Sequence, residues 1–179
     1  MSSHVFEPAA SGRAKCRGCS DRIVKNELRF GERLPNPYAD GEDAEMTHWF
    51  HVPCAAFMRP EPFLEGLAEA SPAIDDRERL MREAELGIAH RRLPRVSKAG
   101  RAPSGRARCR SCREMIEKDA WRVSLVFYED GRFAPSGFIH VACAPAYLET
   151  TDCLDRLRHF SPELSDGDVE EIRAGLEGH

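Results

Sequence analysis

Long apolar runs are absent from this chain of 179 residues, and no window approaches the roughly 18 consecutive apolar residues that a membrane-spanning helix needs. Residues 1–10 also lack the apolar stretch of a secretory signal peptide. A glycine-rich phosphate loop, a pair of catalytic carboxylates and a Ser-His-Asp order are missing as well. We therefore expect an intracellular protein that has no membrane partner, no small-molecule substrate and no enzymatic activity.

Lysine is scarce, with 4 residues against 22 arginines. Together with the many alanines, glycines and prolines, this composition is typical of a GC-rich genome, so it favours the cytoplasm or nucleoid of a bacterium over a eukaryotic nucleus. The net charge of −4 argues against nucleic acid as a partner. However, residues 91–122 carry eleven Lys and Arg against three Asp and Glu, and residues 13–33 carry seven against three. Charges are screened over about 8–10 Å, so a ligand responds to these local basic clusters.

The phrase S-G-R-A-x-C-R-x-C occurs twice, at residues 11–19 and 104–112. The same shift of 93 residues also aligns Ile23 with Ile116 and Arg29 with Arg122, which indicates an internal repeat. We predict a first module over residues 1–90, a basic linker over residues 91–103 and a second module over residues 104–179.

Both modules show the same order of patterns, which predicts an α+β fold with a short antiparallel sheet and flanking helices in each. Strands are expected over residues 28–34, 46–51, 120–128 and 133–139. Helices are expected over residues 52–58, 61–67, 77–86, 141–148, 154–160 and 168–176, with Gly87 ending the third of them. Modules of about 90 residues bury only a marginal core, so each requires an additional staple.

The cysteines provide that staple, because a reducing compartment favours metal binding over disulfides. Each Cys-x2-Cys turn places two thiolates near one ion, and a later His-x2-Cys completes a tetrahedral Cys3His set. The predicted ligands are Cys16, Cys19, His51 and Cys54 in the first module, and Cys109, Cys112, His140 and Cys143 in the second. Four protein ligands leave no open position, so we expect two structural zinc ions, one per module.

Two further residues, His48 and Cys153, could also be considered as metal ligands. His48 stands three residues before His51, but the matching position of the second copy is Gly137. Only the nearer histidine is therefore repeated, and His48 is interpreted as a surface residue or a neighbour of the ligands. Cys153 has no counterpart in the first module and is interpreted as a small buried hydrophobic residue.

The ligand phrase, the following I-x-K and the H-W-F-H-x2-C segment resemble the zinc fingers of eukaryotic poly(ADP-ribose) polymerase, which also occur in a DNA ligase. The resemblance covers both modules and implies Cys3His modules that bind DNA at nicks, gaps or ends, in DNA repair or damage sensing. It includes no catalytic domain. A repair protein is a further expected partner.

In that family, basic residues hold phosphates and apolar loop residues stack on exposed base pairs. Carried over by position, the implied DNA-binding residues are Arg13, Arg17, Arg29, Tyr38, Met46, Arg106, Arg108, Arg122 and Phe133. The sequence departs from the family in the loop of the first module, which is longer and acidic. Trp49 and its counterpart Phe138 are interpreted as core residues.

The alternative hypothesis is a zinc-stabilised adaptor for protein–protein interaction, with an acidic helix over residues 75–85 or 166–177 as its surface. An enzyme that uses a cysteine nucleophile is disfavoured, because zinc ligation occupies six of the seven thiols.

Overall fold

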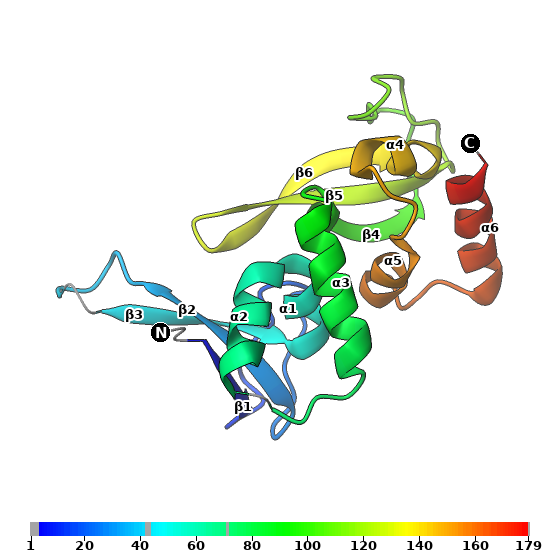
Figure 1. The fold of residues 1–179 in the computed structure, drawn as a ribbon. Coiled ribbons are helices and arrows are strands. Elements are labelled where there is room, and N and C mark those ends of the chain that lie inside the picture. The colour runs from blue at the N-terminus through cyan, green and yellow to red at the C-terminus, as the bar shows by residue number, and fades with distance from the viewer. Residues whose placement is uncertain (1–3, 42–43, 71, 179) are drawn as a thin grey trace. The chain divides into compact units, whose positions relative to one another are not determined.

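The computed structural model describes residues 4–41, 44–70 and 72–178. The chain divides into two compact units, Met1–Ala89 and His90–His179. Each unit contains a three-stranded antiparallel sheet and helices (Figure 1). The predicted α+β class, with two tandem modules, is confirmed. Among the described residues, no helix combines the length and the apolar character needed to cross a membrane.

The first unit pairs its strands in the order β1-β2-β3. The strands are β1 (Val5–Pro8), β2 (Leu28–Pro35) and β3 (Glu45–His51), and the helices that follow are α1 (Val52–Met58), α2 (Pro60–Ala70) and α3 (Arg77–Ala89). Alternation on β2 and β3 turns Phe30 and Phe50 into the core, where both are fully buried with Phe63 of α2. The ring centroids of Phe30 and Phe63 lie 6.1 Å apart in an edge-on arrangement, which is a favourable geometry for aromatic pairs.

The second unit has the sheet order β4-β5-β6. Its elements are η1 (Leu93–Arg95), β4 (Val96–Arg101), β5 (Trp121–Glu129), β6 (Arg132–His140), η2 (Val141–Cys143), α4 (Ala144–Leu148), α5 (Leu154–Phe160) and α6 (Asp166–Glu177). Val123 and Ile139 of the paired strands are fully buried, as are Leu157 of α5 and Ile172 of α6. The core therefore lies between the sheet and these helices.

The basic linker predicted over residues 91–103 is wrong. Val96–Arg101 forms the edge strand β4, in which Gly100 and Arg101 pair with Arg122 and Trp121 of β5. Val96 and Ala99 are buried, but the small and basic residues between them conceal the alternation that identifies a strand. A shift of 93 residues places β4 on β1, so the repeat itself contained the signal.

Two predictions about helices also differ from the structure. Gly87 does not end its helix, because α3 continues to Ala89 and buries Gly87. The helix predicted over residues 141–148 is a single 3-10 turn, η2, followed by the short helix α4. The remaining predicted strands and helices lie at their expected places, with ends that differ by at most three residues.

Backbone hydrogen bonds repeat with the sequence phrase and attach each Cys-x2-Cys turn to its sheet. The N–H of Cys16 donates to the carbonyl of Asp21 at 2.8 Å, and Cys109 donates to Glu114 at 2.8 Å. The next residue of each turn bonds to the third strand: Arg17 donates to Trp49 at 2.9 Å, and Arg110 donates to Phe138 at 2.9 Å. The turn is therefore held at a defined place relative to the histidine that ends β3 or β6.

Candidate metal centres and their basic surroundings

Each unit gathers one histidine and three cysteines into a compact cluster. The clusters are Cys16, Cys19, His51 and Cys54, and Cys109, Cys112, His140 and Cys143. Within each, the ligand atoms all lie within 4.8 Å of one another. The first two cysteines come from the turn, the histidine from the end of the third strand, and the last cysteine from the helical turn after it. The sequence-predicted ligands are thus brought together in both units.

The separations between ligand atoms fit a zinc ion. Tetrahedral zinc with Zn–S of about 2.3 Å and Zn–N of about 2.0 Å separates sulfur from nitrogen by about 3.5 Å. The His51 Nδ1 atom lies 3.3 Å from the Cys19 sulfur and 3.9 Å from the Cys54 sulfur. In the second cluster, His140 Nδ1 lies 3.4 Å from Cys112 and 3.7 Å from Cys143. The two clusters are sites for two structural zinc ions.

The protein orients the histidine of the first cluster for this role. The Nε2–H of His51 donates to the carbonyl of Arg22 at 3.2 Å. Because a carbonyl only accepts, this bond places the proton on Nε2 and leaves the Nδ1 lone pair for the metal. Such a partner fixes both the tautomer and the direction of the ring.

Backbone N–H groups surround the first sulfur of each cluster. Gly18 and His51 donate to the Cys16 sulfur at 3.3 and 3.4 Å, and Ser111 and His140 donate to the Cys109 sulfur at 3.4 Å each. These donors stabilise a thiolate, which is the form that binds zinc.

The titration of the ligands follows from this crowding. Burial disfavours the charged form of Cys109, but backbone N–H groups, among them that of His140, outweigh it and lower the pKa of the thiol to about 6. Hydrogen bonding to the Cys16 and Cys19 sulfurs raises the pKa of His51 to about 11. Without metal, the imidazole therefore holds a proton that zinc must displace. Zinc binding releases protons and becomes more favourable as the pH rises.

The arginines predicted to contact DNA fall into two groups. Arg13, Arg17, Arg106 and Arg108 are exposed beside the cysteine turns. Arg29 and Arg122 instead lie on aromatic rings: the Arg29 guanidinium carbon is 3.5 Å from the centroid of Trp49, and that of Arg122 is 3.6 Å from the centroid of Phe138. The expectation that Trp49 and Phe138 are core residues is wrong, since both are half-buried and support a cation.

The two stacked arginines differ in their partners. Arg29 is buried and donates to the Glu7 carboxylate at 2.8 Å. Arg122 is half-buried, and Gly100 stands opposite it on β4, where Glu7 stands opposite Arg29 on β1. Among the described residues, Arg122 has no acidic partner. Burial lowers the pKa of Arg122.

The residues nominated for base stacking are unequally available. Tyr38 is 93% exposed in the loop between β2 and β3. Met46 is half-buried on β3 opposite Leu34. Phe133 is half-buried, and its ring packs on that of Tyr128 with centroids 4.8 Å apart.

Two residues near these sites escaped the sequence reasoning. Arg110 is the counterpart of Arg17, so the 93-residue shift could have found it; its guanidinium donates to the carbonyl of Ser136 on β6. Phe127 on β5 is 42% exposed, with the Arg95 guanidinium carbon 5.4 Å from its ring centroid. No sequence signal separated Phe127 from the buried positions of its strand.

The interpretation of His48 as a surface residue is wrong. His48 also lies outside the metal cluster. It is buried on β3, across from Glu32 of β2. Burial and the nearby Arg17 charge lower the pKa of His48. Cys153 is buried outside both clusters, as the interpretation of a small hydrophobic residue requires.

Residues 7–87 match the family described as "Poly(ADP-ribose) polymerase and DNA-Ligase Zn-finger region". This match spans nearly all of the first unit, which is thus similar to PARP-type zinc fingers. The second unit repeats its ligand phrase, its Cys3His cluster and its sheet. The predicted resemblance to PARP-type zinc fingers is thereby confirmed, and the matched region of the family is a zinc-finger region rather than a catalytic one.

Curated relatives extend the likeness beyond the first unit. Poly [ADP-ribose] polymerase 1 of Danio rerio is 32% identical over 134 residues, which cover 66% of this chain and 13% of the relative. The corresponding protein of Xenopus laevis is 30% identical, with coverage of 65% and 13%. Polynucleotide 3'-phosphatase ZDP of Arabidopsis thaliana is 25% identical over 197 residues, which cover 94% of this chain and 27% of the relative. The chain thus spans about an eighth to a quarter of the length of these relatives.

Proposed function

We propose that this protein binds DNA through its two zinc fingers and recognises strand breaks, namely nicks, gaps or ends, in DNA repair or damage sensing. One observation carries the proposal. In each unit, an arginine opposite the zinc-binding histidine lies on an aromatic ring, as Arg29 does opposite His51 and Arg122 opposite His140. The same stacked guanidinium therefore recurs at the same place relative to a metal centre. Of these two guanidinium groups, only that of Arg122 has no carboxylate partner among the described residues.

Phosphate recognition follows from the chemistry of these side chains. A guanidinium forms two parallel hydrogen bonds with a phosphate, and stacking on an aromatic ring fixes the plane in which it does so. Arg13 and Arg106 stand three residues before the first cysteine of each turn and are exposed. Since zinc and the sheet hold that turn, these arginines are presented without a large entropic cost of ordering the backbone.

Preference for a break requires groups that stack on exposed base pairs. Tyr38 in the first unit, with Phe133 and Phe127 in the second, are aromatic residues on or between the paired second and third strands. Base–aromatic stacking contributes about 1–3 kcal/mol per base, but a base pair offers its face only where the duplex is interrupted. Two tethered weak sites that engage together also raise the overall affinity.

The names of the relatives point to the same class of ligand. The matched family includes a DNA ligase region, and the Arabidopsis relative is a polynucleotide 3'-phosphatase. DNA is thus named in the description of the family, and a polynucleotide in the name of one relative. DNA, with a repair protein as a further partner, is the corresponding proposal for this chain.

An anisotropy titration with zinc-loaded protein tests the proposal. Labelled nicked, gapped and blunt-ended duplexes are compared with a covalently closed circle, with and without a zinc chelator. We expect tighter binding to the interrupted duplexes, loss of binding with chelator, and an affinity that falls steeply with salt. Equal affinity for closed and nicked DNA would contradict the break preference.

Charge reversal identifies the phosphate contacts. Replacing Arg13 and Arg106 together by Glu is expected to weaken binding to nicked DNA at least tenfold and to reduce the salt slope by about two, one per lost phosphate contact. Zinc content and the thermal melt should not change. The matched control reverses Arg82 and Arg158, which are exposed on helices. If the control loses as much affinity as the turn variant, a general charge effect replaces the proposed contacts. Unchanged DNA binding in the turn variant supports the adaptor hypothesis instead.

A further inference from the structure

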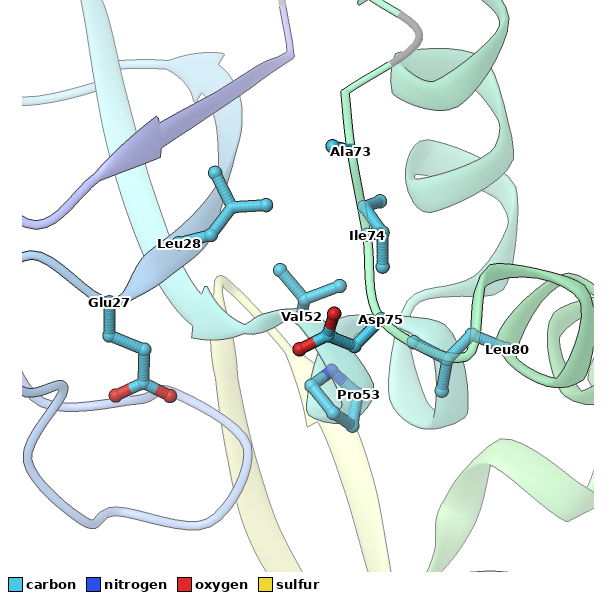
Figure 2. A pocket seen from close by; sticks show the side chains of 8 residues that line it. All are labelled: Glu27, Leu28, Val52, Pro53, Ala73, Ile74, Asp75 and Leu80. Atoms are coloured by element: carbon cyan, nitrogen blue, oxygen red, sulfur yellow. The ribbon is translucent and has the colours of Figure 1, made fainter.

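A hollow of about 280 Å³ opens in the first unit between the start of β2, the start of α1 and the segment that leads into α3. Its apolar walls include Leu28, Val52, Ile74 and Leu80, and two acidic residues, Glu27 and Asp75, also line it. Figure 2 shows Leu28, Val52 and Ile74 around the hollow, with the Asp75 carboxylate directed towards Val52.

The second unit has an aromatic residue at the position that corresponds to Leu28. Trp121 begins β5 as Leu28 begins β2, at the repeat shift of 93 residues. Its indole Nε1–H donates to Glu171 of α6 at 2.8 Å. The Arg101 guanidinium carbon lies 4.3 Å from the centroid of the indole, and the guanidinium donates to the same carboxylate oxygen at 2.6 Å. An aromatic ring, a stacked guanidinium and a carboxylate thus join the strand start to the helix.

The first unit retains only part of this arrangement. Leu28 is smaller than an indole, and Pro8 stands where Arg101 stands in the second unit. The carboxylates of the first unit come from other positions: Asp75 precedes α3 and Glu27 precedes β2, whereas Glu171 lies within α6. Asp75 is exposed and has no basic partner within the described ranges, while one Glu27 oxygen accepts from the Val24 N–H at 3.1 Å. What the hollow lacks, relative to the second unit, is an aromatic ring with a cation beside it.

We propose that the hollow of the first unit is a docking site for a segment of a partner protein that presents an aromatic side chain next to an arginine. The ring fills the space that Trp121 occupies in the second unit, and the guanidinium pairs with Asp75. Burying an aromatic side chain removes about 150–250 Å² from water, and the cation satisfies a carboxylate that otherwise faces solvent. Asp75 and Glu27 repel phosphate, so this site is separate from the surface proposed for DNA.

The test uses the full zinc-loaded chain and the blocked dipeptide Ac-Trp-Arg-NH2, followed by ¹H–¹⁵N chemical shifts. Two matched probes are Ac-Trp-Glu-NH2, which reverses the charge, and Ac-Ala-Arg-NH2, which removes the ring. We expect Ac-Trp-Arg-NH2 to bind at least tenfold more tightly than either, with shifts confined to the residues around the hollow. Equal binding of the Trp-Arg and Trp-Glu probes would overturn the proposal.

Two variants locate the binding site. Leu28→Trp copies the second unit, fills the hollow and is expected to weaken binding of Ac-Trp-Arg-NH2 at least tenfold, with a melting temperature no lower than that of the wild type. Asp75→Lys is expected to abolish the preference for arginine, whereas the control Glu78→Lys, with the same charge change on exposed α3 surface, retains it. Undiminished binding to Leu28→Trp overturns the proposal. Affinity for nicked DNA, measured in parallel, should be unchanged in Leu28→Trp, so this test fails or succeeds independently of the DNA-binding proposal.

Discussion

At the scale of single residues, the first unit has a buried ion pair where the second unit has two apolar side chains. The Glu32 carboxylate is fully buried and accepts from the Nε–H of Arg59 at 2.9 Å. At the corresponding positions the second unit has Leu125 and Leu148, both buried. Removing one partner of a buried pair leaves an uncompensated charge, whereas replacing both by apolar residues is often neutral or stabilising. Equivalent positions are thus filled by an ion pair in the first unit and by two leucines in the second.

This difference predicts the outcome of a paired substitution. Glu32→Leu alone is expected to lower the free energy of unfolding of the first unit by about 3 kcal/mol, because the Arg59 guanidinium then loses its carboxylate in a largely buried setting. Glu32→Leu with Arg59→Leu, which copies the second unit, is expected to restore that loss or exceed it. Chemical denaturation of both variants measures the two values. A double variant as unstable as the single one would show that the first unit cannot accommodate the apolar pair.

At the scale of elements, α6 begins with a complete capping box. Ser165 accepts from the N–H of Asp168 at 3.1 Å, and the Asp168 carboxylate accepts from the N–H of Ser165 at 2.9 Å. That backbone hydrogen bond lowers the pKa of Asp168. Because the folded protein favours the ionised form, the contribution to stability is present above the unfolded pKa of about 4 and is lost as the pH falls through the lower folded value. The capping box therefore stabilises α6 more at neutral than at acidic pH. This helix packs on η2 and carries Glu171.

Asp168→Asn is accordingly expected to destabilise the second unit near pH 7, with a difference from the wild type that shrinks as the pH falls below about 4. Ser165→Ala should cost about 1 kcal/mol, as is usual for a lost N-cap. Urea denaturation at pH 7 and pH 3 measures both effects. Asp166→Asn is the control, since it removes a first-turn charge but leaves the capping box. A pH-independent effect of Asp168→Asn would contradict the assigned role of its carboxylate.

At the scale of the whole molecule, each unit has its own metal cluster, so zinc loss should occur in steps. The wild type is expected to hold two ions per chain, Cys16→Ala and Cys109→Ala one each, and the double variant none. Cys153→Ala, the matched control outside both clusters, should hold two. Structural zinc supplies on the order of 10 kcal/mol of apparent folding free energy, so each single variant should also lose one of two unfolding transitions. Zinc content by elemental analysis and calorimetry check these outcomes. Two ions in Cys16→Ala would contradict the assigned ligand set.

Recognition of the metal sites from the sequence succeeded because ligand spacing is a local property that was present in two copies. Comparison of the copies also identified His51 rather than His48 as the repeated ligand position, and the structure places His51 in the cluster. The burial of His48 was not predictable in the same way, since it depends on its cross-strand neighbour Glu32 and on Arg59, which follows α1 and pairs with Glu32. The strand β4 was missed because its alternation rests on small residues, although the repeat contained the signal.

The sequence by itself determined the two-module plan, the α+β class and the eight metal-binding side chains, because these follow from repeat spacing, residue periodicity and the coordination chemistry of zinc. Only the tertiary structure decided which charges remain available. It gives Arg29 a carboxylate partner from β1 and leaves Arg122 without one, because Glu7 and Gly100 occupy the same register position on equivalent edge strands. It likewise leaves a hollow beside Leu28 where Trp121 joins strand to helix in the second unit. Partners of this kind are brought together by sheet register and helix packing between residues distant in sequence, which a local pattern does not contain.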